Sequence, residues 1–286
     1  MIRYAKPRDV DEALALLGEA SWKILAGGTD FYPALGNRPL TDNVLDINAL
    51  DDLRGIAETE THLVIGARTT WADVTKHRLP PSFDMLKQSA REVGSPQIQN
   101  VATIAGNLCN ASPAADGVPP LLVLDAEVEL RSLSGSRVLP LSGFILGNRR
   151  IASRPDEMVT AILVPKASLG GTSSFQKLGA RRYLVISIAM AAARVVTDAH
   201  GRIETAVIAV GACSAVAQRL AGLETVLVGL RSATEIESAV MAAPLDELSP
   251  IDDVRGTADY RRAAAREIAV RAILGALGLG EAEAAA

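Results

Sequence analysis

The sequence predicts an α+β fold in two parts. Up to about residue 168, short strand-like and helix-like segments alternate along the chain. From residue 174 to 213, three longer apolar segments separated by turn residues are typical of antiparallel strands, and three helical segments follow them. A stretch rich in glycine and serine, residues 167–173, separates the two patterns, and 286 residues are enough for two domains of ordinary size.

The first part is expected to begin with a helix, because Asp9 is suited to the N-cap position and apolar residues recur at helical spacing from Val10 to Leu17. Thr70 or Asp73 is suited to cap a second helix. The strands expected here are residues 22–25, 44–47, 62–66, 127–131, 138–139 and 158–164, and the further helices are at 72–74, 82–93 and 119–124.

The second part is expected to hold a three-stranded antiparallel sheet followed by a helical bundle. Its strands are 174–178, 186–197 and 202–213, and its helices are 220–230, 234–242 and 258–277. We expect the last helix to be amphipathic, to end at Gly278 and Gly280 before a frayed tail, and to keep four basic residues in water: Arg261, Arg262, Arg266 and Arg271. The predicted domain boundaries are 1–57, 58–168 and 172–286.

Composition excludes several classes of function. Hydrophobic residues make up 49%, charged residues 22% and the net charge is −4, which gives no support to nucleic-acid binding. Apolar runs are too short for a membrane span and the N-terminus lacks the apolar core of a signal peptide, so we expect a cytoplasmic protein. Cys109 and Cys213 are too few for an iron–sulfur cluster, and the three histidines have no ligand spacing, so no metal site is expected.

Two glycine-bearing segments, both expected to be loops, carry the functional signal. The first is residues 26–30, Ala-Gly-Gly-Thr-Asp, and the second is 103–107, Thr-Ile-Ala-Gly-Asn, which continues to Asp116. Each follows an apolar stretch that suggests a strand, and such segments let backbone N–H groups approach an anion. Two of them suggest one long phosphate-bearing ligand held at two points. The alternatives are a tight turn for the first segment and a polar surface loop for the second.

Neither segment has the G-x-G-x-x-G pattern of a Rossmann site or the G-K-[ST] of a Walker loop. They resemble instead the two FAD-binding signatures of the medium subunit of molybdenum hydroxylases, which include the carbon monoxide dehydrogenase flavoprotein, xanthine dehydrogenase and 4-hydroxybenzoyl-CoA reductase. Residues 176–182 and 251–262 resemble later segments of the same family. The resemblance implies a two-part FAD-binding domain of the vanillyl-alcohol-oxidase (PCMH) type, followed by a smaller α+β domain.

The resemblance also implies residue roles. The backbone of 27–29 and residues 103–107 would hold the pyrophosphate, residues 23–25 would lie near the adenosine, and Asp116 would bind a cofactor hydroxyl. Tyr183 would stack on the isoalloxazine ring or else serve ordinary packing. The full set of implied FAD-binding residues is Lys23, Ile24, Leu25, Ala26, Gly27, Gly28, Thr29, Asp30, Phe31, Thr103, Ala105, Gly106, Asn107, Ala111, Asp116, Val159, Lys177 and Tyr183.

Ala105 stands where the family commonly has the first glycine of a Gly-Gly pair, and its methyl group fits if the residue keeps a negative φ. The cysteine-bearing insert of the 4-hydroxybenzoyl-CoA reductase branch is missing, so no cluster is expected in this chain.

The expected function is that of an FAD-dependent electron-transfer subunit. Electrons would come from a molybdenum-cofactor-containing large subunit through the [2Fe–2S] clusters of a small subunit and leave to NAD, a quinone or oxygen. The chain has no nucleophile–base motif, so no catalytic side chain is assigned. The alternatives are a free-standing FAD oxidoreductase and a flavin-free assembly subunit.

Overall fold

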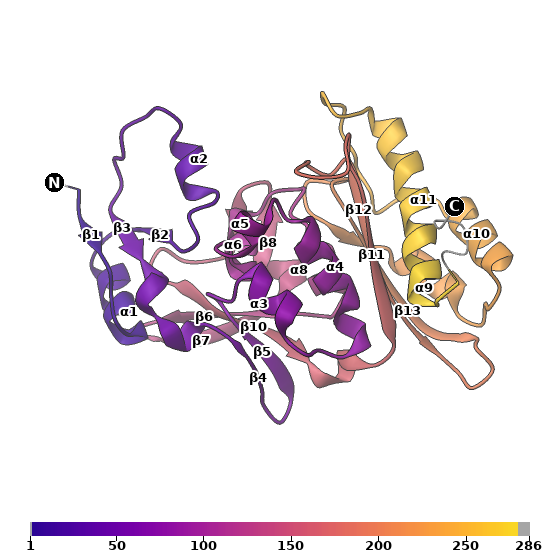
Figure 1. Ribbon diagram of the computed structural model, residues 1–286, viewed down its shortest axis with the longest axis horizontal. Coiled ribbons are helices and arrows are strands. Elements are labelled where there is room, and N and C mark those ends of the chain that lie inside the picture. Colours follow the sequence, from indigo (N-terminus) through magenta and orange to yellow (C-terminus); the bar gives the residue numbers. More distant parts are fainter. Residues whose placement is uncertain (1, 280–286) are drawn as a thin grey trace.

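The computed structural model describes residues 2–279, and the predicted tail at 281–286 lies outside this range. Figure 1 shows three larger sheets that follow one another along the long axis of the molecule. Their strand orders are β1-β3-β2, β4-β5-β10-β6-β7 and β11-β12-β13-β14, and a two-stranded sheet, β8-β9, is added to the central part. We call these regions the N-terminal, central and C-terminal lobes. The α+β class is confirmed, whereas the predicted domain boundaries stay predictions.

The N-terminal lobe is a small parallel sheet covered by one helix. Its elements are β1 (Tyr4–Ala5), α1 (Val10–Glu19), β2 (Lys23–Leu25), α2 (Phe31–Leu35) and β3 (Val44–Asp46), followed by 3-10 turns at Ile47–Ala49 and Asp51–Leu53. The Asp9 side chain accepts a hydrogen bond from the Glu12 N–H and so caps α1 as predicted. Helix α1 buries Leu14 and Leu17 against Leu45 and against Met158 of the central lobe.

The central lobe is an antiparallel five-stranded sheet with helices on one face. The five strands are β4 (Ile56–Glu58), β5 (His62–Gly66), β6 (Glu127–Ser132), β7 (Gly135–Pro140) and β10 (Met158–Pro165), and the separate two-stranded sheet consists of β8 (Ile145–Gly147) and β9 (Arg150–Ile151). Its helices are α3 (Trp71–Lys76), α4 (Asp84–Glu92), α5 (Pro96–Gln99), α6 (Ile104–Asn110), α7 (Val118–Val123) and α8 (Leu141–Phe144), with 3-10 turns at Pro81–Phe83 and Lys166–Leu169. Trp71, Phe83 and Phe144 are among its largest fully buried side chains.

The C-terminal lobe is a sheet buried on both faces. It contains β11 (Thr172–Leu178), β12 (Ala189–Thr197), β13 (Ile203–Gly211), β14 (Gln218–Arg219), α9 (Ala221–Leu227), α10 (Ala233–Ala242) and α11 (Ala258–Ala276). Figure 1 shows this sheet between α11 on one side and α4 of the central lobe on the other. Alternate residues of β12 face opposite ways, because Ala191 packs with the helices of its own lobe and Met190 with the core of the central lobe.

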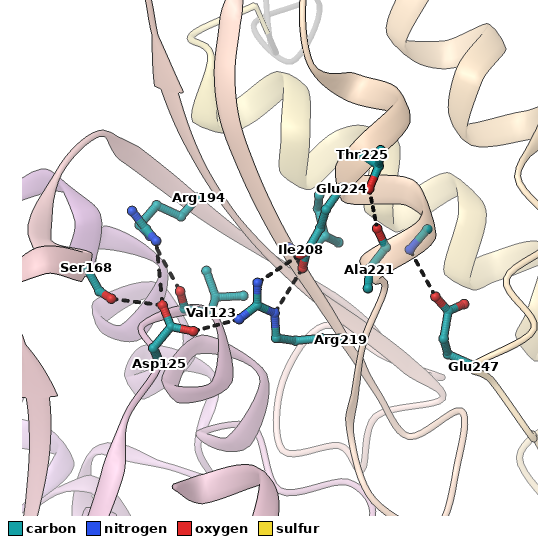
Figure 2. Close-up of polar contacts among 11 residues, drawn as sticks. Val123, Asp125, Ser168, Arg194, Ile208, Arg219, Ala221, Glu224, Thr225 and Glu247 are labelled. Carbon is teal, nitrogen blue, oxygen red and sulfur yellow. Dashed lines mark hydrogen bonds and ion pairs between the residues drawn. The ribbon is translucent and has the colours of Figure 1, made fainter.

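Charged side chains join the central and C-terminal lobes (Figure 2). Asp125 follows α7 and accepts hydrogen bonds from Arg219 at 2.6 Å and from Ser168 at 2.9 Å. Arg219 also pairs with Glu224 at 2.8 Å, and buried Arg194 lies 3.9 Å from Asp125. These hydrogen bonds and ion pairs link the two lobes across an interface that is otherwise apolar.

Two details of the prediction for the C-terminal lobe are wrong. The sheet has four strands, since Gln218 and Arg219 pair with β13 as β14. Arg261 is not in water but 3% exposed, because its guanidinium donates to the Ile188 and Ala212 carbonyls and pairs with Asp253 at 2.6 Å. Over residues 2–279, none of the helices combines the length and the apolar character that crossing a membrane requires.

Candidate functional site

A cleft of about 1050 Å³ lies between the N-terminal and central lobes. Its volume exceeds what a small metabolite needs and is of the size that a large cofactor occupies. The structure brings together at its wall most of the residues that the sequence singled out. These are Lys23, Ile24, Ala26, Gly27, Gly28, Thr29, Asp30, Phe31, Thr103, Ala105, Gly106, Asn107 and Val159.

The first glycine segment presses directly against the turn that leads into the second segment. A Cβ atom on Gly27 would lie 2.0 Å from the carbonyl oxygen of Val101, so only glycine allows this approach. Gly28 has a φ of +74°, which glycine adopts without strain. Asn110 also donates to the Asp30 carboxylate at 2.7 Å. The two segments therefore form one continuous surface, as two holding points for a single ligand require.

The second segment is the start of a helix and not a loop, which corrects the prediction. Thr103 is the N-cap of α6, and its hydroxyl accepts from the Gly106 N–H at 3.0 Å. The residues before it form α5 and a turn, so the expected preceding strand is also wrong. A threonine directly before an apolar residue is a candidate N-cap, so Thr103 before Ile104 is the signal that could have indicated this helix start from the sequence.

Helix α6 presents a free amide to the cleft. In its first turn, the Ile104 N–H bonds to the Thr69 carbonyl and the Asn107 N–H to the Thr103 carbonyl, whereas the Ala105 N–H has no acceptor within residues 2–279. Because Ala105 lies inside a helix, its φ is negative and its methyl group fits without strain. An unpaired amide at a helix N-terminus is a suitable donor to a phosphate oxygen.

Residues 151–159 form a further wall, of which the sequence indicated only Val159. Glu157 is buried in this wall, and Arg137 holds it with two hydrogen bonds of 2.7 and 2.8 Å. The Arg154 N–H also donates to it, at 2.7 Å. The bonds from Arg137 are the largest reason that the pKa of Glu157 is lowered, so Glu157 is a fixed anion that orders this segment.

Another part of the wall comes from residues 38–42, which follow α2 and were not predicted to contribute. Helix α2 buries none of its own side chains, so this part of the N-terminal lobe rests on few apolar contacts. The arginine of this stretch, Arg38, donates to the Ala34 carbonyl at 2.8 Å.

The structure places the other predicted site residues away from the cleft wall. Leu25 is a buried residue of β2, and Ala111 ends α6 with a φ of +47°. Tyr183 is 64% exposed in the segment between β11 and β12, beside the guanidinium of Arg182. Their roles toward a cofactor stay predictions.

Asp116 and Lys177 form a buried ion pair. The Lys177 Nζ lies 2.7 Å from one carboxylate oxygen of Asp116, and the Ser187 hydroxyl donates to the other oxygen at 2.8 Å. Burial raises the pKa of Asp116, while Lys177 and Ser187 favour the charged form. Both oxygens of Asp116 are thus used within the protein, and the pair joins the central lobe to β11 of the C-terminal lobe.

These features fit a dinucleotide cofactor. The cleft is large enough for a sizeable cofactor, glycine backbone and the start of α6 both belong to its wall, and that wall offers both apolar and polar groups. The fold and the site together define a protein that binds a phosphate-bearing cofactor between two lobes.

Comparison with known proteins gives the family. Residues 1–167 match the FAD binding domain in molybdopterin dehydrogenase, and residues 173–276 match the CO dehydrogenase flavoprotein C-terminal domain. The chain therefore belongs to the family of FAD-binding subunits of molybdenum hydroxylases. FAD is the cofactor, and the protein is an oxidoreductase subunit, as the sequence predicted.

Individual relatives agree with this assignment. The medium chain of the carbon monoxide dehydrogenase of Hydrogenophaga pseudoflava is 30% identical over 279 residues, which cover 94% of this chain and 95% of that one. The nicotinate dehydrogenase FAD-subunit of Eubacterium barkeri is 36% identical over 193 residues, 65% of each chain. A structure of the reconstituted CO dehydrogenase from Oligotropha carboxidovorans superposes with a TM-score of 0.89 at 27% identity, covering 98% of this chain and 99% of that chain.

Proposed function

We propose that this chain is the electron-transfer subunit of a heteromeric molybdenum hydroxylase. It takes electrons from the [2Fe–2S] clusters of a small subunit, after a large subunit has oxidised the substrate at its molybdenum cofactor, and passes them to an external acceptor such as NAD, a quinone or oxygen. The observation that carries the proposal is the single cleft in which the two cofactor-binding segments touch, in a chain that matches medium chains over most of its length. We place the complex in the cytoplasm.

The residues of the cleft divide the binding of FAD between them. Gly27, Gly28 and Thr29 with the first turn of α6 hold the diphosphate, and Lys23 and Ile24 lie toward the adenosine end. FAD itself supplies the capacity to accept and release electrons, and the protein's task is to bind and orient it. The Arg137–Glu157 pair serves this task by ordering the wall at residues 151–159.

Two glycine variants test this assignment. Gly28→Val places a branched side chain at a positive φ in the cleft, where its Cβ would meet the Tyr32 ring at 2.7 Å. Gly229→Val is the matched control, since Gly229 has a φ of +86° with open space around it and lies in the C-terminal lobe. We expect purified Gly28→Val to lose its bound FAD and Gly229→Val to keep it. Equal FAD content in the two variants would contradict the role of the first segment.

Co-purification distinguishes the proposal from its two alternatives. Affinity purification of the tagged chain from its native host should yield stoichiometric partner chains that contain molybdenum and iron. A yellow chain recovered without such partners would support a free-standing FAD oxidoreductase. A colourless chain recovered with them, which releases no FAD on denaturation, would support an assembly subunit.

A further inference from the structure

Two asparagine side chains hold the first glycine segment, residues 26–30, at its two ends. The carbonyl oxygen of Ala26 accepts from the side-chain amide of Asn48 at 2.8 Å, and Asn48 belongs to the N-terminal lobe. The carboxylate of Asp30 accepts from the side-chain amide of Asn110 at 2.7 Å, and Asn110 is the last residue of α6 in the central lobe. The segment is therefore bonded to a different lobe at each end.

Between these two ends the backbone offers three amides in a row. Gly27, Gly28 and Thr29 lie outside the helices and strands, and their N–H groups have no backbone acceptor within residues 2–279. All three residues are partly exposed and line the FAD cleft. Successive free N–H groups suit an anion, but glycine backbone does not hold one conformation by itself. The direction of these amides therefore depends on the contacts that hold the segment.

Arg149, in the turn between β8 and β9, fixes the orientation of the Asn110 side chain. Its guanidinium donates to the side-chain oxygen of Asn110 and, at 3.3 Å, to the Asn110 backbone carbonyl. Because a cation engages the oxygen, the NH₂ group is left to face Asp30. The Arg149 N–H also donates to the Ala111 carbonyl at 2.9 Å, and Ala111 and Arg149 have φ values of +47° and +58°. Such strained non-glycine residues cluster at ligand clamps.

We propose that Asp30 and Asn110 are positioning residues for FAD, whose hydrogen bond holds residues 27–29 with their amides toward the cofactor diphosphate. The inference rests on the proposed function, which assigns this segment to the diphosphate. Both residues line the cleft, one from each lobe. A carboxylate that follows Thr29 directly would repel a diphosphate if it turned into the cleft, and Asn110 keeps it engaged elsewhere.

The test exchanges the two side chains. Asn110→Leu removes the bond to Asp30 without adding charge, and Asn110→Asp sets two carboxylates against each other. Asp30→Asn combined with Asn110→Asp restores an amide–carboxylate pair in reverse and leaves the net charge of the cleft unchanged. The matched control is Asn43→Leu, because the Asn43 side chain accepts from the Arg3 N–H and donates to the Ser21 carbonyl, both at 3.0 Å and both within the N-terminal lobe.

The first measurement is the rate of FAD release. Each chain is purified from the native host with the partner chains that accompany it, so that unchanged recovery of these partners shows that the variant folds. Release is followed by the rise in flavin fluorescence after dilution. We expect both single Asn110 variants to release FAD roughly tenfold faster, as for a lost hydrogen bond to a charged group, and the exchanged pair and the control to stay within about threefold of wild type.

The second measurement separates the positioning of the amides from a general loss of structure. ADP and adenosine compete with FAD for rebinding to flavin-depleted protein, and only ADP carries the diphosphate. We expect Asn110→Leu to weaken competition by ADP by roughly the same tenfold factor and to leave competition by adenosine unchanged. A role limited to holding the lobes together would weaken both competitors equally.

The outcomes distinguish this inference from the function on which it rests. If Asn110→Leu releases FAD at the wild-type rate, or if the exchanged pair releases it as fast as Asn110→Asp, the inference is overturned and the function stands. Equal weakening of ADP and adenosine would also overturn it. If the wild-type protein binds no FAD at all, the proposed function fails and the inference fails with it.

Discussion

Asp73 offers a sharp test of how the α3 start is stabilised, because one carboxylate makes three contacts there. It accepts two hydrogen bonds from Arg54, at 2.9 and 3.0 Å, and one from the Thr70 N–H at 3.0 Å. Burial alone would raise the pKa of Asp73, but the bonds from Arg54 and Thr70 outweigh it and lower the pKa to about 2. The variant Asp73→Asn keeps the size of the side chain and an oxygen for the cap while it removes the charge.

The expected loss of stability in Asp73→Asn follows from the shift in the pKa of Asp73. A folded-state pKa about two units below the unfolded value corresponds to at most ~2.5 kcal/mol of stability at pH 7. Arg54 is about half exposed, so solvent screening reduces the expected loss in Asp73→Asn to roughly 1–2 kcal/mol. Because the folded pKa is depressed, this stabilisation is present above the unfolded pKa of about 4 and is lost as the pH falls toward about 2.

The assay is urea unfolding of both chains at pH 7 and at acidic pH. We expect the difference in unfolding free energy to fall to about half by pH 3. The control is Glu267→Gln, which breaks an exposed pair with Arg271 whose side chains are 58% and 65% exposed, and should cost less than ~0.5 kcal/mol. A loss in Asp73→Asn that is the same at pH 7 and pH 3, or no larger than in the control, would refute the reasoning.

Two further predictions concern the lobe contacts. Removing one partner of the buried pair in Lys177→Met should cost about 3–5 kcal/mol in urea unfolding. The loss should be larger at pH 8 than at pH 5, because the Asp116 carboxylate then has to ionise unpaired. The double variant with Asp116→Asn should recover most of that loss, and additive losses would argue against a coupled pair. Gly27→Ala should destabilise the chain by about 1–3 kcal/mol and reduce its FAD content, because the new methyl group collides with the backbone at Val101. The control Gly170→Ala has open space around it and should do neither. Retained FAD in Gly27→Ala would contradict the close contact.

Local rules made much of the fold predictable. Asp9 and Thr70 are N-caps as expected, because capping depends on residues three positions apart. Gly201 occupies a positive φ in the turn between two long strands, as a tight hairpin requires. Such features are determined within a few residues, so a single sequence contains the information.

Features that depend on distant partners were missed. Arg261 is buried because it reaches carbonyl oxygens 73 and 49 residues away, and helical periodicity alone cannot indicate such partners. The pairing of Arg137 with Glu157 spans 20 residues and joins a hairpin to the cleft wall. The expected three-stranded sheet omitted β14 because its two residues are too short to show an alternating pattern.

The two glycine segments show why the site needed both the sequence and the structure. Sequence indicated a ligand held at two points, but it could not show that Gly27 touches Val101 or that the second segment begins a helix. The contact makes the segments one surface, and the helix explains why Ala105 is tolerated where a loop would have favoured glycine. The first turn of α6 is bonded to α3, whereas α2 buries none of its side chains, so the central lobe supplies the rigid half of the cleft. A cofactor held by both halves would therefore fix the N-terminal lobe onto a surface that is already formed.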